Sequence, residues 1–331
     1  MAQVNDLLAF VVLRSFWICC HVATAAFLIS LRAISLMLGP HQAPPLRRLP
    51  SPSRETMGAL LETLPIVTLP ERFAEGFVLS FAPCSNLCLY MLGAAACLQR
   101  ASNFQSVKPG LVFKGVSSGA LVAALLAMGS NVPQLFEECL GLLATLNHRR
   151  GGWLGAYSTT IRQILRHATS ASVSVEPGTL QVGVTAFDVA PQLKEIKDFQ
   201  SAKDVEETVL ASCYIPVVWE EPIWLKDLGP CLDGGPFGFL IDGDVVFSPY
   251  HSNVPDVGPA EEYPRTLVFQ PVDAQDMLRL FEDGYRHCVS WIQQGCPSRR
   301  SERQAVWAEP GSGSPKTLVM EGWKTLRELV A

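Results

Sequence analysis

The sequence predicts an α/β fold, a sandwich built on a mainly parallel central sheet, and three observations lead to this prediction. Strand-like and helix-like stretches alternate through the middle of the chain, an order typical of parallel sheets covered by helices. Apolar residues make up 48% of the chain and charged residues only 17%, against about 25% charged in an average soluble domain. The chain therefore either buries a large sheet or touches a membrane. Its 331 residues are enough for a sizeable core.

The alternation begins near residue 75 and continues into the last third of the chain. Apolar runs predict strands over residues 75–83, 110–116 and 179–187, the last with the alternation of a half-buried strand. Small and apolar residues at helical spacing predict helices over residues 86–101, 118–129, 132–147 and 202–214. A long amphipathic helix is expected over residues 274–295.

The two ends of the chain differ from this body. Residues 15–31 carry no formal charge and lie between two arginines, close to the length of a membrane-spanning helix. We expect residues 1–38 to form a hydrophobic N-terminal helix that anchors the chain; a cleaved or organelle-targeting segment and a buried core helix stay open as alternatives. Proline-rich residues 39–70 predict a linker, residues 71–296 the folded domain, and residues 297–331 a loosely attached tail.

Charge and cysteine usage exclude several classes of function. The net charge is −5 and lysines and arginines form no block, so we expect no nucleic-acid partner. The ten cysteines are scattered and mostly lie in apolar runs, which is typical of reduced core thiols in an intracellular protein. Cys84 and Cys88 are four residues apart, but no His or Cys pair follows them at zinc spacing. We therefore expect neither a metal site nor a cofactor.

The stretch from Gly115 to Gly119 reads G-V-S-S-G and fits the pattern G-x-S-x-G between a predicted strand and a predicted helix. A nucleophilic serine needs such a sharp turn, and its neighbours must be small because backbone crowds the turn. The helix that follows would point its N-terminal amides at a developing oxyanion. The alternative is an ordinary turn whose serine caps the helix. We predict Ser117 as the nucleophile, with Gly115 and Gly119 forming a nucleophile elbow.

A serine needs a base before it can act as a nucleophile. The chain order Ser…Asp…His would allow Asp233 with His251 or His287, but neither histidine has a distinctive neighbourhood. The other candidate is a carboxylate directly beside the serine. Asp233-Gly234-Gly235 follows a predicted strand, and its two glycines would let backbone approach the serine while the carboxylate points inward. An ordinary Asp-Gly turn is the alternative.

Taken together, these pieces resemble the patatin-like phospholipase family, especially the animal branch that contains adiponutrin and adipose triglyceride lipase. Five stretches carry the resemblance, in order over about residues 75–295: LSFAPCSNLCLYMLGAAACLQR, GVSSGALVAALL, VLASCYIPVVW, CLDGGPFG and VVFSPYHSNVPDVGP. The resemblance implies a three-layer sandwich and a Ser-Asp dyad without histidine, with Ser117 as nucleophile and Asp233 as base. It also implies acyl transfer through an acyl-enzyme on lipid esters such as acylglycerols or phospholipids.

The chain departs from the family at the expected oxyanion hole. Where the family has a glycine-rich run, this chain has Pro83, Cys84, Ser85 and Cys88. Proline has no N–H, and side chains disfavour the positive φ that such a loop can require. Losing one oxyanion donor typically costs ~10²–10³ in rate. Cys84 and Ser85 still carry amides and are the predicted, depleted oxyanion hole.

Two functions therefore stay open. The first is a membrane-tethered lipid acyl hydrolase or transacylase, with its body in the cytosol at a lipid droplet or the endoplasmic reticulum. The resemblance implies this location, and a density of arginines that is greater after the hydrophobic segment than before it favours a cytosolic body. The second is a catalytically weak relative that binds lipid or a lipase that it regulates.

Overall fold

The computed structural model describes residues 54–147, 157–168, 175–187, 191–215, 223–235, 242–263 and 274–308. The strands are β1 (Phe77–Phe81), β2 (Leu111–Val116), β3 (Leu180–Phe187), β4 (Pro191–Ile196), β5 (Ile223–Leu225), β6 (Gly229–Asp233) and β7 (Val245–Phe247). The longer helices are α2 (Arg54–Thr63), α3 (Cys88–Arg100), α5 (Ser118–Ala127), α6 (Val132–Asn147), α7 (Tyr157–Ala168), α8 (Ala202–Cys213), α10 (Ala274–Gln293) and α11 (Arg300–Ala308). Short helical turns are η1 (Glu71–Glu75), η2 (Ser85–Leu87), α4 (Phe104–Val107), η3 (Lys108–Gly110) and η4 (His251–Asn253).

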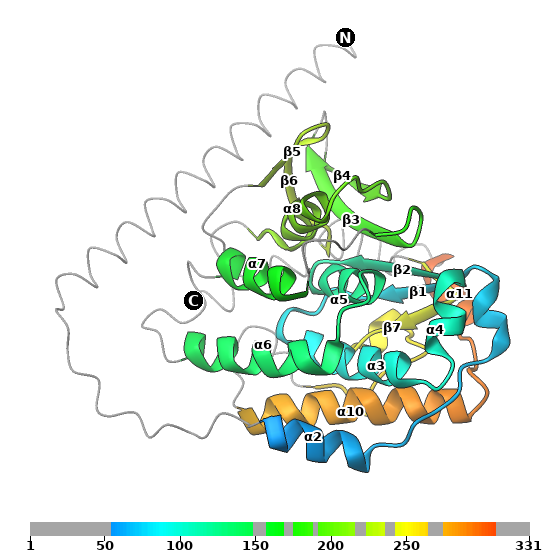
Figure 1. Cartoon of the computed structure of the whole chain (residues 1–331). Coiled ribbons are helices and arrows are strands. Elements are labelled where there is room, and N and C mark those ends of the chain that lie inside the picture. The colour runs from blue at the N-terminus through cyan, green and yellow to red at the C-terminus, as the bar shows by residue number, and fades with distance from the viewer. Residues whose placement is uncertain are drawn as a thin grey trace, which may run out of the picture.

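The strands form one mixed sheet in the order β5-β6-β3-β2-β1-β7, with β4 paired to β3 (Figure 1). The pairs β7–β1, β1–β2 and β2–β3 are parallel, whereas β3–β4, β3–β6 and β5–β6 are antiparallel. The prediction of an α/β fold with a central sheet is confirmed. The prediction that the sheet is mainly parallel holds only for its β7–β3 half, because β4, β5 and β6 add antiparallel pairings that the apolar runs did not indicate.

Helices cover the sheet because their apolar residues need a partner surface. All residues of α5 are buried, and this helix packs on β1, β2 and β3, while α8 packs on β3, β5 and β6. Helix α3 packs against α5, α6 and α10, and in the view of Figure 1 α3 and α6 lie between the sheet and α10. Because α5 has no polar face, the sequence fixes it as an interior helix.

Both predicted boundaries of the folded domain differ from the packing. Within the stretch expected to be a linker, α2 and the segment after it bury Met57, Leu64, Val67 and Leu69 in the core. The hydrophobic helix expected over residues 1–38 lies outside the described residues. The folded domain therefore begins at least as early as Met57.

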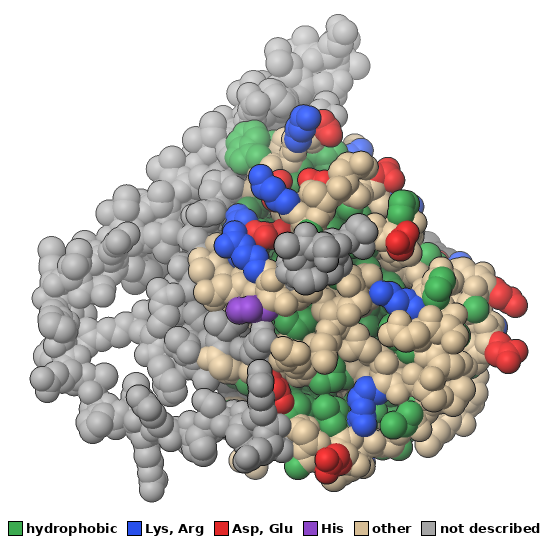
Figure 2. Space-filling model, in the orientation of Figure 1, with side chains coloured by type: hydrophobic (Ala, Val, Ile, Leu, Met, Phe, Trp, Pro, Cys, Tyr) green, Lys and Arg blue, Asp and Glu red, His purple; other side chains and the backbone are tan. Residues whose placement is uncertain are grey.

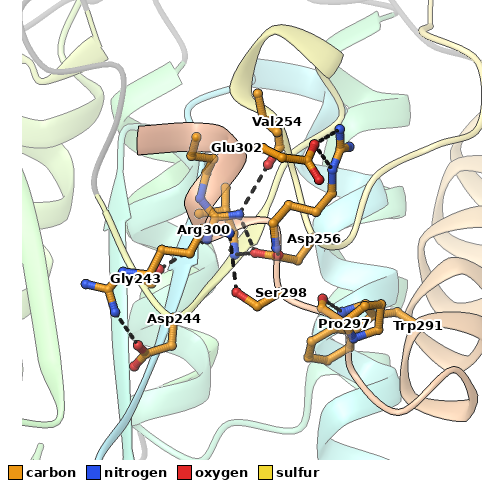
Figure 3. A network of polar contacts seen from close by, with 12 residues as sticks. Gly243, Asp244, Val254, Asp256, Trp291, Pro297, Ser298, Arg300 and Glu302 are labelled. Atoms are coloured by element: carbon orange, nitrogen blue, oxygen red, sulfur yellow. Dashed lines mark hydrogen bonds and ion pairs between the residues drawn. The ribbon is translucent and has the colours of Figure 1, made fainter. Parts of the chain in front are cut away.

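The C-terminal tail also holds a helix that is tied to the sheet edge (Figure 3). Arg303 of α11 is fully buried, and its Nη1 donates to Asp256 Oδ2 at 2.6 Å. The same carboxylate oxygen accepts the Val246 N–H of β7 at 2.7 Å. Arg300 reaches Asp244 with 2.9 Å between Nη1 and Oδ1. The tail is thus part of the domain up to α11, because a buried guanidinium and carboxylate stabilise its attachment to β7.

The described surface carries charges of both signs. Arg162 and Arg166 of α7 contact Glu206 of α8, at 2.8 Å and 3.6 Å, and Figure 2 shows basic and acidic side chains next to one another over this region. These pairs hold α7 on α8. Among the helices of the described residues, none combines the length and the apolar character needed to cross a membrane.

Candidate active site

The predicted nucleophile and the predicted base meet because β2 and β6 share one edge of β3. Strand β2 pairs in parallel with β3 as far as Gly183, whereas β6 pairs antiparallel from the other direction and stops at Asp233 opposite Val184. Strand β4 lies along residues 182–187 of the same strand, so β2 and β6 must both occupy the opposite edge. The last residues of β2 and β6 therefore adjoin, and Ser117, the residue after β2, lies beside Asp233.

Ser117 occupies a strained turn between β2 and α5. Its φ of 55° and ψ of −131° are unusual for any residue with a side chain. Its N–H donates to Ser212 Oγ at 2.8 Å, and the Ser212 hydroxyl in turn donates to the Gly183 carbonyl at 2.6 Å. This fully buried serine of α8 holds the turn in place, so the surrounding structure compensates for the strain.

The two glycines of the elbow are required by close backbone contacts. A Cβ on Gly115 would overlap the Gly119 carbonyl, and a Cβ on Gly119 would overlap the Phe81 carbonyl of β1. The first turn of α5 therefore lies directly against β2 on one side and the end of β1 on the other. The interpretation of both glycines as spacers of the turn agrees with this geometry.

Asp233 ends β6 with its carboxylate directed at Ser117. The Ser117 hydroxyl donates to Asp233 Oδ2 at 2.6 Å, while Oδ1 accepts the Gly235 N–H at 2.7 Å. Ser117 and Asp233 are 8% and 6% exposed. A Cβ on Gly234 would lie 2.7 Å from Val116 Cγ1 and from the Gly183 carbonyl oxygen. The Asp-Gly-Gly stretch thus brings backbone close to the elbow and fixes one oxygen of the carboxylate, leaving the other for the serine.

Burial controls the ionisation of this carboxylate. Loss of hydration raises the pKa of Asp233 from 3.8 to about 7, although the hydrogen bonds from Ser117 and the Gly235 amide lower it. A carboxylate with a pKa near neutrality is a suitable general base, because it both holds and releases a proton at working pH.

The histidines considered as alternative bases lie elsewhere. His251 Nε2 contacts the Pro259 carbonyl at 2.7 Å, and His287 Nδ1 contacts the Tyr90 hydroxyl at 3.1 Å in the interface of α3 and α10. Within the described residues, the Ser117 hydroxyl therefore donates to Asp233 and not to a histidine.

The predicted oxyanion loop passes the N-terminus of α5. The Cys84 N–H donates to Ser118 Oγ at 3.0 Å, and Ser85 has a positive φ of 48°. A positive φ at a serine is the conformation that a glycine adopts without strain. The loop thus keeps a backbone shape suited to glycine, but the Cys84 amide points at a side chain of the elbow.

Comparison with known proteins assigns this chain to a family. The sequence model of the patatin-like phospholipase family matches residues 79–255, which is more than half of the chain and includes both Ser117 and Asp233. The chain belongs to the patatin-like phospholipase family. The resemblance seen in the sequence is confirmed at the level of the family, and the particular animal branch stays a prediction.

Two known proteins show similarity to this patatin-like chain. Human "Patatin-like phospholipase domain-containing protein 4" is 24% identical over 256 residues, which cover 74% of this chain and 97% of the relative. The structure of VipD from Legionella pneumophila is 11% identical with a TM-score of 0.36, covering 66% of this chain and 67% of VipD.

Sequence reasoning missed several residues of this patatin-like site. Ser212 orients Ser117, yet in the sequence it was only part of a stretch that resembles the family. Its neighbour Cys213 is buried, and burial together with the Asp233 charge raises the pKa of its thiol, while a hydrogen bond with Ser117 lowers it. Ser118 bonds the Cys84 amide. Among the described residues, no group of three or more His, Cys, Asp or Glu side chains is arranged to hold a metal ion.

Proposed function

We propose that this chain is a lipid acyl hydrolase or transacylase that works through an acyl-enzyme on Ser117, with Asp233 as the general base. Membership of the patatin-like phospholipase family supports a lipid ester as substrate. The observation that carries the proposal is the 2.6 Å hydrogen bond from the Ser117 hydroxyl to a buried carboxylate, since an activated serine needs an adjacent base.

The chemistry follows from this contact. As Ser117 Oγ attacks the ester carbonyl, its proton moves to Asp233 Oδ2 and the carbonyl oxygen becomes an oxyanion. The proton then passes to the departing alcohol, and the acyl group stays on Ser117. Water, or a second alcohol in a transacylase, then attacks the acyl carbonyl and gives its proton to Asp233. Asp233 returns that proton to Ser117 Oγ as the bond between the acyl carbon and Oγ breaks and the acid or a new ester leaves. The N-terminus of α5 faces the developing negative charge and stabilises it.

Turnover of defined lipid esters by the purified full-length chain tests the proposal. Dioleoylglycerol and a phosphatidylcholine in detergent micelles are the substrates, and released oleate is the readout. We expect release by the wild type and a loss of at least ~10³-fold in Ser117→Ala and Asp233→Asn. Equal release by the wild type and Ser117→Ala would contradict the proposed nucleophile.

The second candidate is a catalytically weak protein that binds lipid or a lipase partner. Two features of the oxyanion loop favour this candidate: the Cys84 N–H is already bonded to Ser118 Oγ, and Pro83 has no N–H. A site with few oxyanion donors has a low catalytic rate but can still bind its lipid. The double variant Pro83→Gly/Ser85→Gly separates the two. A steep rise in turnover over the wild type would favour the weak-catalyst function, whereas unchanged or lower turnover would favour the hydrolase.

We propose that the chain attaches to a membrane or lipid-droplet surface and binds its substrate there. The apolar composition of the chain and the uncharged stretch 15–31 support this attachment. Flotation of the full-length chain with phosphatidylcholine vesicles tests it, with Phe27→Lys as the variant. We expect the variant to stay in the unbound fraction, because a charge in the middle of an apolar segment costs ~3 kcal/mol; equal flotation would argue that another part of the chain binds.

A further inference from the structure

The loop between β1 and α3 is held against the elbow from two sides. The Ala82 N–H donates to the Phe247 carbonyl of β7 at 3.0 Å, and the rings of Phe81 and Phe247 stack with 4.7 Å between their centroids. On the other side, Gly119 contacts the Phe81 and Ala82 carbonyls so closely that a Cβ would overlap them. Residues 82–84 therefore have little freedom to move away from the N-terminus of α5.

Backbone donors next to the nucleophile are already committed. Pro83 has no N–H. The Ser117 N–H is bonded to Ser212 Oγ at 2.8 Å, and the Cys84 N–H is bonded to Ser118 Oγ at 3.0 Å. An oxyanion formed at Ser117 would thus find these amides occupied, although it could still use the N–H of Ser118, which as the first residue of α5 has no acceptor within the helix.

The Ser118 hydroxyl oxygen is held in place by contacts with Cys84. It accepts the Cys84 N–H, and Cys84 Sγ lies 3.6 Å from the same oxygen. Burial raises the pKa of the Cys84 thiol well above its usual value, so the sulfur keeps its proton, which it donates to Met91 Sδ at 4.0 Å. A hydroxyl has one donor and two acceptor positions, and one that accepts is a stronger donor. The Ser118 proton then faces the Cys84 sulfur at 3.6 Å, which is a weak acceptor, and a stronger acceptor such as an oxyanion can take this hydrogen bond.

We propose that Ser118 is a catalytic residue whose hydroxyl, held by the Cys84 amide, donates a hydrogen bond to the oxyanion in place of a glycine-loop amide. This inference rests on the proposed function, because it concerns the transition state of acyl transfer at Ser117. The Cys84 amide then acts through Ser118 and is a positioning group. The Ser118 side chain would supply a donor that Pro83 and the Cys84 amide cannot.

The same contact has an opposite interpretation, in which Ser118 blocks the oxyanion site and must swing away. We favour the donor because the hydroxyl is held on one side by two groups of Cys84, an amide and a thiol, on a loop that is itself fixed. A block would have to break both contacts in each turnover.

Hydrolysis of p-nitrophenyl butyrate by the full-length wild type, Ser118→Ala and Ser118→Thr tests the proposal. We expect kcat to fall ~10²–10³-fold in Ser118→Ala, with KM unchanged, and to recover to within ~10-fold of the wild type in Ser118→Thr, which keeps the hydroxyl. Inhibition by an alkyl trifluoromethyl ketone, whose adduct with Ser117 carries an oxyanion, should weaken by the same factor in Ser118→Ala. The corresponding secondary alcohol, which forms no oxyanion, should bind the wild type and Ser118→Ala equally.

Fold defects are separated by a matched pair of variants. If Ser118→Ala fails to fold, Ser118→Thr and Ser118→Val differ only in the hydroxyl, and the proposal requires the threonine variant to be at least ~10²-fold faster. Rates and ketone affinities within threefold of the wild type in Ser118→Ala, or a faster Ser118→Ala, would overturn the inference and leave the proposed function intact. A folded wild type that neither turns over the ester nor binds the ketone would overturn both.

Discussion

Acidification should abolish the proposed hydrolase activity by protonating Asp233. Only the ionised carboxylate accepts the Ser117 proton, and the pKa of about 7 that burial imposes makes the active fraction about half at pH 7 and about one hundredth at pH 5. We therefore expect kcat/KM to fall about tenfold for each pH unit below about pH 6 and to level off above pH 8. An ordinary exposed aspartate would keep the rate constant down to about pH 4.

The assay is butyrate release from p-nitrophenyl butyrate between pH 5 and pH 9, followed by chromatography because the colour of nitrophenol itself depends on pH. Circular dichroism at each pH confirms that the chain stays folded. Asp233→Asn should retain a low rate without this inflection. A rate that is constant from pH 5.5 to pH 8.5 in the wild type, or an inflection near pH 4, would refute the argument that a buried Asp233 is the base.

Three further predictions concern stability, measured as the free energy of unfolding in urea. Folding raises the pKa of Asp233, so the native state binds the proton more tightly than the unfolded chain does, and the wild type loses stability as the pH rises from about 4 to about 7. Asp233→Asn should not lose stability over this range, and at pH 8 its free energy of unfolding should exceed that of the wild type by up to about 4 kcal/mol. Equal pH profiles of the two proteins would contradict this. Gly119→Ala should cost at least ~3 kcal/mol because the new methyl group meets backbone, whereas Gly58→Ala, at an exposed position of α2 with open space around it, should stabilise by up to ~1 kcal/mol. Similar values for both would show that the elbow tolerates a side chain. Arg303→Met should cost ~3–5 kcal/mol by leaving a buried carboxylate unpaired, and Arg300→Met, in exposed ion pairs, less than ~1 kcal/mol; a small loss in the first would mean that α11 contributes little to the fold.

The nucleophile elbow could be predicted from the sequence because neighbouring residues determine its shape. A strand, a small-residue turn and a helix follow one another within 17 residues from Leu111 to Ala127, so the position of Ser117 depends on short-range geometry. Asp233 was predicted as the base for Ser117 from the resemblance to the patatin-like family together with the two glycines that follow it. That it meets Ser117 because two strands share one edge of β3 depends on long-range pairing, which no local pattern encodes.

The parts that the sequence did not predict share this long-range character. Ser212, Ser118 and Arg303 each act through a contact with a segment far away in the chain or across a turn, and each is unremarkable among its sequence neighbours. Helix α11 falls within the stretch predicted as a loosely attached tail, and its buried ion pair between Arg303 and Asp256 joins two segments that are far apart in the sequence. The antiparallel half of the sheet also depends on pairing between distant segments, and β5, with only three residues, is too short to show a strand pattern in the sequence.

The most direct test of the account is whether Ser117 is an activated nucleophile. The full-length chain is incubated with an alkyl fluorophosphonate, and its intact mass and peptides are analysed. We predict one adduct on the peptide that contains Ser117, none in Ser117→Ala, and formation slowed at least ~10²-fold in Asp233→Asn. A folded wild type that forms no adduct, or an adduct that persists in Ser117→Ala, would contradict the central claim.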